Sequence, residues 1–178
     1  VRDATEGIRL CRDNDNAYHI RAEGYRMQSK FSESIADATR SIKFQPRRPD
    51  AYSTRADCHR MLGQNSECIR DCNAAISLDP KFELAYRVRC NCYRILGRLD
   101  ESIKDGDMSI KLATGTARGA AYRSRSQSHF ANQDVDAAII DINIALNISP
   151  TDIPGLRARA SYYRSKSMWD MVYSDVVR

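Results

Sequence analysis

Arg55 stands at an unexpected position in the stretch YSTRADCHRMLG, residues 52–63. With the three- and four-residue spacing of an α-helix, Tyr52, Ala56 and His59 share one face with Arg55, so a guanidinium lies in the middle of the inward stripe. A guanidinium can hold a carboxylate or a phosphate through two parallel hydrogen bonds. This position therefore predicts either an anion at a functional site or an acidic side chain that neutralises a buried cation.

Few other side chains are suited to catalysis or to metal binding. His59 and His129 recur at one position of a repeat where other copies have tyrosine. Cys68 and Cys72 share a helix face and could hold a metal ion with His59, but the paired spacings of zinc sites are missing, which favours small core residues instead. The chain also has no glycine-rich phosphate loop and no HExxH or GxSxG motif. We therefore expect no catalytic activity, no metal and no cofactor.

The composition is that of a folded domain with a small positive charge. The 178 residues are 42% hydrophobic, and the net charge of +5 permits an anionic partner but is lower than in most nucleic-acid binders. The most apolar segment, AAIIDINIAL at 137–146, contains Asp141 and is too short to span a membrane. The six cysteines show no CxxC pair and no disulfide framework, which favours a reducing compartment. We expect the cytoplasm, with the nucleus as the alternative.

The chain repeats itself with a period of 34 residues. Pro46 and Pro80 are 34 positions apart, and the segments before them align without a gap: AYHIRAEGYRMQSKFSESIADATRSIKFQP and AYSTRADCHRMLGQNSECIRDCNAAISLDP. Three more copies follow, beginning at Ala85, Ala121 and Gly155, and the last is shortened. We expect repeat units at 15–48, 49–82, 83–118, 119–152 and 153–178, with 1–14 as the tail of a preceding unit.

Each column of the repeat has a constant physical character. Three columns form the stripe of a first helix: Tyr18, Tyr52, Tyr86, Tyr122 and Leu156; Ala22, Ala56, Cys90, Ser126 and Ala160; Tyr25, His59, Tyr93, His129 and Tyr163. Apolar columns such as Ile35, Ile69, Ile103 and Ile139 form a second helix after a turn marked by Gly63 or Gly97. The predicted helices are 16–28, 32–44, 50–62, 66–78, 84–96, 100–112, 118–131, 135–148, 153–166 and 169–178.

One such helix pair cannot bury its own apolar faces, so neighbouring pairs must stack. The expected fold is all-α, an α-solenoid. The 34-residue period, the aromatic and small columns, the Gly turn and the terminal Asp-Pro of LGQNSECIRDCNAAISLDP (62–80) resemble the tetratricopeptide repeat family. The resemblance covers nearly the whole chain and implies a right-handed superhelix of antiparallel helix pairs. Thr114 in place of the proline and Leu156 in place of the aromatic residue depart from the pattern.

The arginine of the opening stretch recurs in every copy, and so does an aspartate on the second helix. The two columns are Arg21, Arg55, Arg89, Arg125 and Arg159, and Asp37, Asp71, Asp105, Asp141 and Asp175, with Asp3 ahead of them. A repeated set favours a structural ion-pair ladder over one special ligand site. Each arginine is expected to bind the aspartate of its own repeat or that of the previous repeat, which Asp3 would supply for Arg21.

The first helices of stacked pairs line the concave surface, so their remaining residues are those that a ligand meets. Three columns lie there: Arg26, Arg60, Arg94, Phe130 and Arg164; His19, Ser53, Arg87, Arg123 and Arg157; Glu23, Asp57, Asn91, Gln127 and Ser161. The charge is mixed at first and positive toward the C-terminus. An ordinary solvated face is the alternative to a binding groove. The predicted binding residues are Arg60, Arg87, Asn91, Arg94, Arg123, Gln127, Phe130, Arg157 and Arg164.

The family resemblance implies an adaptor that takes an extended peptide or a partner helix in this groove. The arginines favour an acidic segment across Arg87, Asn91, Arg94, Arg123 and Gln127, with Phe130 as an apolar contact between the acids. The repeats are similar to those of co-chaperones. The carboxylate clamp for a heat-shock chaperone tail would need Lys and Asn on one repeat, where this chain has Arg87 and Asn91. It would also need Asn on the next repeat and Lys and Arg on the third, but these requirements fall on Ser124, Pro154 and Ala158, which do not fit.

Two other functions stay open at this point. One is a structural module that uses the convex face or the ends of the stack, and the other is RNA binding, which the scarcity of groove aromatics disfavours. We expect no membrane association. Exposure of Ile8, Leu10, Trp169 and Val176 at the ends suggests a longer parent chain or end-to-end pairing. The joint at 113–119 is predicted to be a flexible loop, since it lacks the proline and contains Gly115 and Gly119.

Overall fold

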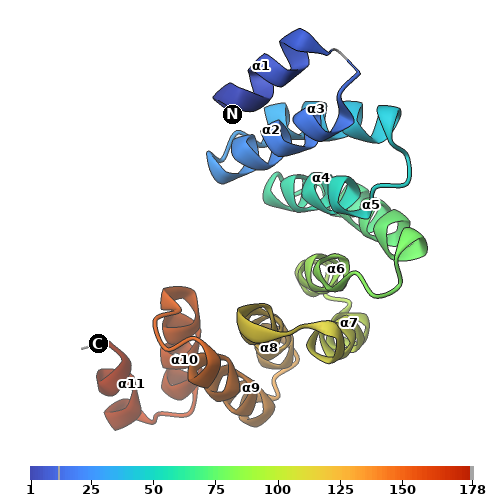
Figure 1. Ribbon diagram of the computed structural model, residues 1–178. Helices are drawn as coiled ribbons and strands as arrows, with labels where there is room; N and C mark the ends of the chain where they lie inside the picture. Colours follow the sequence, from blue (N-terminus) through green and yellow to red (C-terminus); the bar gives the residue numbers. More distant parts are fainter. Residues whose placement is uncertain (12, 177–178) are drawn as a thin grey trace. The chain divides into compact units, whose positions relative to one another are not determined.

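The computed structural model describes residues 1–11 and 13–176, with side chains given up to residue 172. Within that part, every regular element is an α-helix, and no helix there is long and apolar enough to cross a membrane. The helices form antiparallel pairs joined by short turns (Figure 1). This confirms the predicted all-α solenoid.

The first helices of the pairs are α2 (Asp15–Met27), α4 (Pro49–Met61), α6 (Glu83–Ile95), α8 (Gly115–Ala131) and α10 (Ile153–Ser165). The second helices are α3 (Phe31–Phe44), α5 (Asn65–Leu78), α7 (Leu99–Leu112), α9 (Val135–Ile148) and α11 (Trp169–Val176). A single helix, α1 (Arg2–Leu10), precedes them and packs against α2. The predicted helix limits agree with these within one residue, apart from the start of α8 and the end of α11.

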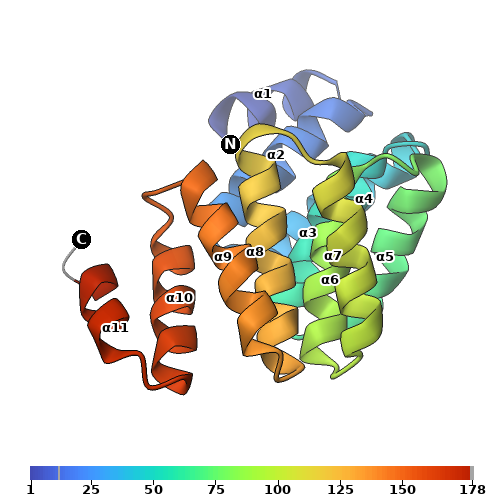
Figure 2. The ribbon, with the colours of Figure 1, turned by 90° about the horizontal axis from the view of Figure 1, so that it is seen from below.

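The chain divides into two compact units, residues 1–88 and 89–178, with the boundary inside α6. In the first unit, α2 contacts α4 and both contact α3, whereas α3 and α5 do not touch. In the second unit, α8 contacts α10 and both contact α9, whereas α7 and α9 do not touch; Figure 2 shows α8, α9 and α10 side by side. Because only the first helices approach one another, they form the inner face of each unit.

Every turn inside a helix pair has the same geometry. Residues 29, 63, 97, 133 and 167 have a left-handed backbone, with φ between 58° and 74°, and two of them are glycines. The next residue donates its backbone N–H to the carbonyl five positions earlier, for instance Gln64 to His59 at 2.9 Å and Asp134 to His129 at 2.9 Å. This is the Schellman motif, which ends a helix and satisfies its last carbonyls. The acceptors all lie in the aromatic and histidine column described above.

Small residues allow the paired helices to approach closely. Ala22, Ala56 and Cys90 are fully buried, and Ser102 on α7 donates its hydroxyl to the carbonyl of Cys90 at 2.7 Å. Ser34 on α3 makes the same bond to the carbonyl of Ala22 at 2.7 Å. The buried hydroxyls of Ser34 and Ser102 therefore have partners, and each adds a hydrogen bond to a small packing surface.

The joint between α7 and α8 is not the loop predicted from ATGTARGA. α8 begins at Gly115 and has 17 residues, whereas the other first helices have 13, so the extra length is helical. Gly119 is buried, and a Cβ there would lie 3.3 Å from Ile148, so this glycine provides close packing. Ala113 and Ala121 are also buried, together with Ile110. The predicted flexibility of residues 113–119 stays a prediction, which hydrogen exchange would test. The loop on which it was based is helical from Gly115 onward.

The cysteines differ from the expectation of six thiols. Cys68 and Cys92 are in the disulfide-bonded state, whereas Cys11, Cys58, Cys72 and Cys90 are not disulfide-bonded. Burial raises the pKa of the Cys90 thiol, which is thus unreactive at neutral pH.

Candidate functional site

The recurrent arginines bind the aspartates of their own repeats. In each pair, the arginine Nε and Nη2 atoms donate to the two carboxylate oxygens of the aspartate sixteen residues later: 2.6 and 2.9 Å for Arg21–Asp37, 2.8 and 2.7 Å for Arg55–Asp71, 2.7 and 2.7 Å for Arg89–Asp105, and 2.7 and 2.7 Å for Arg125–Asp141. The four aspartates are buried. The side chain of Asp175, the predicted partner of Arg159, lies outside the described residues.

The third guanidinium nitrogen, Nη1, reaches back to the preceding helix pair. Arg55 donates to Thr39 at 3.0 Å, Arg125 to Asp107 at 2.6 Å and Arg159 to Asn143 at 2.9 Å. The hydrogen bond to its aspartate raises the pKa of the Arg55 guanidinium, which stays charged at any physiological pH. These arginines thus join a first helix to its own second helix and to the second helix of the preceding pair, and they have little remaining capacity for a ligand.

On the inner face of the first unit, the arginines are neutralised by acids. Arg26 donates to Glu23 at 2.9 Å and to Asp57 at 3.3 Å, and Arg60 donates to Asp57 at 2.6 and 3.0 Å. Glu23 also accepts a hydrogen bond from Thr54. The acidic column described from the sequence is therefore the internal counter-charge of the arginine column. Arg60, predicted to bind a ligand, is already paired.

In the second unit, the same acidic column is neutral. Asn91, Gln127 and Ser161 occupy it, so the arginines three residues later on α6 and α10, Arg94 and Arg164, have no carboxylate beside them. Neither forms an ion pair within the described part of the chain, and Nε of Arg94 is buried without a hydrogen-bond partner there. Asn91 instead donates to Ser124 of α8 at 3.4 Å. Two cations of this face thus lack a counter-charge.

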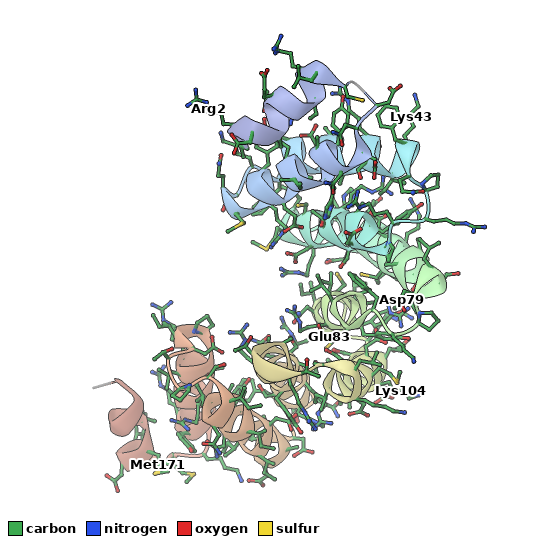
Figure 3. The ribbon with its side chains drawn as sticks, in the orientation of Figure 1. Arg2, Lys43, Asp79, Glu83, Lys104 and Met171 are labelled. Atoms are coloured by element: carbon green, nitrogen blue, oxygen red, sulfur yellow. The ribbon has the colours of Figure 1, made fainter. Side chains whose placement is uncertain are left out.

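The other predicted arginines differ in their pairing. Arg87, in the first unit, donates to Glu83 at 3.1 Å; Figure 3 labels Glu83 at the start of α6. Arg123 of α8 holds Asp152, at the start of α10, at 2.5 and 2.7 Å. Arg157 is exposed and forms no ion pair with the described residues. Among the predicted binding residues, Arg94, Arg157 and Arg164 are therefore the arginines that form no ion pair with the described residues, a distinction that the sequence columns did not make.

Phe130 and Tyr162 form an aromatic pair on the same face. Their ring centroids are 4.6 Å apart with an interplanar angle of 29°, and Tyr162 is 2% exposed. Burial raises the pKa of the Tyr162 phenol, although its hydrogen bond with Ser126 and the nearby charge of Arg94 act in the opposite direction. Sequence reasoning missed Tyr162. The sequence did contain a signal, since Tyr162 is a large aromatic residue in a column where the other repeats have the small residues Gly24, Cys58, Cys92 and Ser128.

The described residues contain no group of three side chains suited to a metal ion, Cys68, Cys72 and His59 included. His59 instead donates a hydrogen bond from Nδ1 to Oε1 of Gln64 at 2.6 Å. The inner face of the second unit carries charged, hydrogen-bonding and aromatic side chains. An arginine side chain can hold carboxylates there, and an aromatic side chain can pack against an apolar group.

No protein-family model and no curated protein matches the chain, but its structure is similar to many solved ones. TTC0263, described as a thermophilic TPR protein in Thermus thermophilus, is 15% identical over 90% of this chain and 87% of its own, with a TM-score of 0.82. The Cut9–Hcn1 hetero-tetramer of the APC/C contains a chain with a TM-score of 0.87 and 16% identity, over 97% of this chain and 34% of that one. YrrB, described as a TPR protein with an unusual peptide-binding site, is 15% identical over 88% of this chain and 79% of its own, with a TM-score of 0.66.

Proposed function

We propose that this chain, which has the tetratricopeptide-repeat fold, is a non-catalytic protein-interaction scaffold whose second unit binds an acidic segment of a partner protein on its inner face. The observation that carries the proposal is the missing counter-charge of Arg94 and Arg164. The equivalent arginines of the first unit, Arg26 and Arg60, bind carboxylates of their own chain. A partner carboxylate would take the place that Asp57 takes in the first unit.

Arg157 belongs to the same surface. It lies seven residues before Arg164 on α10, which is two helical turns and hence on the same side of the helix. Arg123 and Arg87 are less favourable than the sequence suggested, because a ligand would have to displace Asp152 or Glu83 from them. We therefore centre the proposed site on Arg94, Arg157 and Arg164, with Asn91 and Gln127 as neutral hydrogen-bonding groups.

A titration with acidic peptides tests this proposal. Since the face is open to water, each arginine should contribute about 0.5–2 kcal/mol, so binding should be weak and should weaken further as salt is added. Arg94→Glu combined with Arg164→Glu should abolish binding and leave the helical circular dichroism unchanged. An acidic chaperone tail is one of the peptides to include, because it tests the co-chaperone resemblance directly.

Lys104→Glu combined with Lys111→Glu is the matched control. Both lysines are exposed on the second helix α7 of the same unit, and Lys104 is labelled in Figure 3, so the control changes the net charge equally without touching the inner face. Equal binding by the inner-face variant and the control would refute the proposed site. Contacts through the outer surface or the ends of the stack would then explain a scaffold better.

A further inference from the structure

The proposed site has a pattern along the stack. Arg94, Phe130 and Arg164 occupy one column on three successive first helices, α6, α8 and α10. Phe130 is fixed by its stacking on the buried Tyr162, and Arg94 is close enough to influence the pKa of Tyr162. The second unit therefore presents cation, aromatic ring and cation in a row.

The packing of helices sets the spacing of that row. Neighbouring helices pack with axes roughly 8–10 Å apart, so equivalent positions on successive first helices are separated by about 10 Å. A chain in the polyproline II conformation advances about 3.1 Å per residue and presents every third side chain on the same side, about 9.3 Å apart. In a β-strand, two side chains that are three residues apart point to opposite sides, because successive side chains alternate. The row thus matches a polyproline II segment that crosses the helices.

We infer that the partner segment carries an acidic residue, an apolar residue three positions later and a second acidic residue after three more. This inference rests on the proposed function and specifies its ligand. The acids would face Arg94 and Arg164, and the apolar side chain would face Phe130. A carboxylate opposite Phe130 would lose hydration and gain no hydrogen bond, so the central position discriminates against acids.

Phe130 is the determinant of this central position. In the other repeats the column holds arginine, at Arg26, Arg60, Arg94 and Arg164. The ring is partly buried and packs against the core cluster around Ile142 and Tyr162, so its position is rigid before any ligand arrives. A pre-positioned apolar group binds without an ordering cost, which makes it a specificity element rather than a general contact.

Peptides of identical composition test the spacing on the unmodified protein. The first has glutamates at positions 1 and 7 and leucine at 4, with proline and serine between them. The second has leucine at 1 and glutamates at 4 and 7. The third keeps leucine at 4 and has glutamates at 3 and 5. The first should bind about tenfold more tightly than the other two, because each of the others loses one arginine contact. A fourth peptide with the acids at 1 and 15 and leucine at 8 represents a partner helix, in which seven residues cover about 10.5 Å.

Two variants then test the role of Phe130. Phe130→Arg should change the preferred peptide residue at the central position from leucine to glutamate. Phe130→Leu should keep the preference for leucine. Circular dichroism of both variants is the folding control. Equal affinities for the permuted peptides would overturn the spacing and leave the proposed function standing, whereas no binding by any acidic peptide would refute both. Preference for the helical spacing, or equal competition by single-stranded RNA at two salt concentrations, would also overturn the inference.

Discussion

At the scale of single residues, Arg125 shows how differently two acids can contribute to the same guanidinium. Asp141 accepts from Nε and Nη2 and has a 4% exposed side chain, whereas Asp107 accepts from Nη1 and is 55% exposed. Asp141→Asn should lower the free energy of unfolding by about 2–4 kcal/mol, because it leaves a partly buried cation without its main partner. Asp107→Asn should cost less than about 1 kcal/mol, since water screens the exposed pair. Urea denaturation of both variants measures the difference, and equal losses would contradict a structural role for the buried pair.

His19 should make the stability of the first unit dependent on pH. Its Nδ1 is buried without a hydrogen-bond partner among the described residues, and Nε2 lies 3.3 Å from Asp50. Burial lowers the pKa of His19 below its ordinary 6.5, although the charges of Asp50, Glu23 and Asp15 act against this and that of Arg48 adds to it. The unfolded chain then binds a proton more readily, so stability should be complete above pH 6.5 and decrease as the pH falls below it. His19→Gln should remove this pH dependence in thermal melts between pH 5 and 8; an unchanged profile would exclude His19 as its source.

At the scale of elements, the left-handed turns differ in how well their residues suit the backbone. Gln133 has a φ of 62°, and the equivalent Gly63 and Gly97 have open space where a Cβ would lie. Gln133→Gly should therefore stabilise the chain by about 0.5–1 kcal/mol, because glycine adopts this conformation without steric cost. Asn132→Gly is the control, since φ is −82° there and added flexibility should only destabilise. Stabilisation by both changes, or by neither, would show that the left-handed conformation of Gln133 does not lower the stability of the chain.

The helices were predictable because their periodicity is repeated, and the exceptions have physical reasons. Thr114, Gly115 and Gly119 suggested a loop, since glycine and threonine are poor helix formers, yet packing of Gly119 against Ile148 overrides that propensity. The Arg–Asp columns were visible, but only the structure shows that pairing occurs within a repeat. The pairing of Arg123 with Asp152 could not be predicted, because Asp152 belongs to no column that recurs in the chain.

At the scale of the whole molecule, we expect the exposed apolar residues of α1 and α11 to favour self-association. Leu10 of α1 is 74% exposed and Trp169 of α11 is 51% exposed, whereas Ile8 is half-buried and the side chain of Val176 lies outside the described residues. Leu10→Glu combined with Trp169→Glu should reduce any concentration dependence of the sedimentation coefficient, because it removes apolar area from the contact. Ile140→Glu is the control, since Ile140 is exposed and belongs to α9, neither the first nor the last helix. A concentration-independent coefficient for the unmodified chain would refute the prediction.

The extended beginning of α8 makes this position suitable for protein engineering. The other first helices begin three residues before the column of Tyr18, Tyr52, Tyr86 and Leu156, whereas α8 begins seven residues before Tyr122. The four additional residues are close to one helical turn, so the stripe that follows keeps its orientation toward α9. A biosensor needs a reporter that is joined rigidly to its recognition surface. A further helical turn with a fluorophore-bearing cysteine, inserted ahead of Gly115, would move with α8 and hence with Phe130.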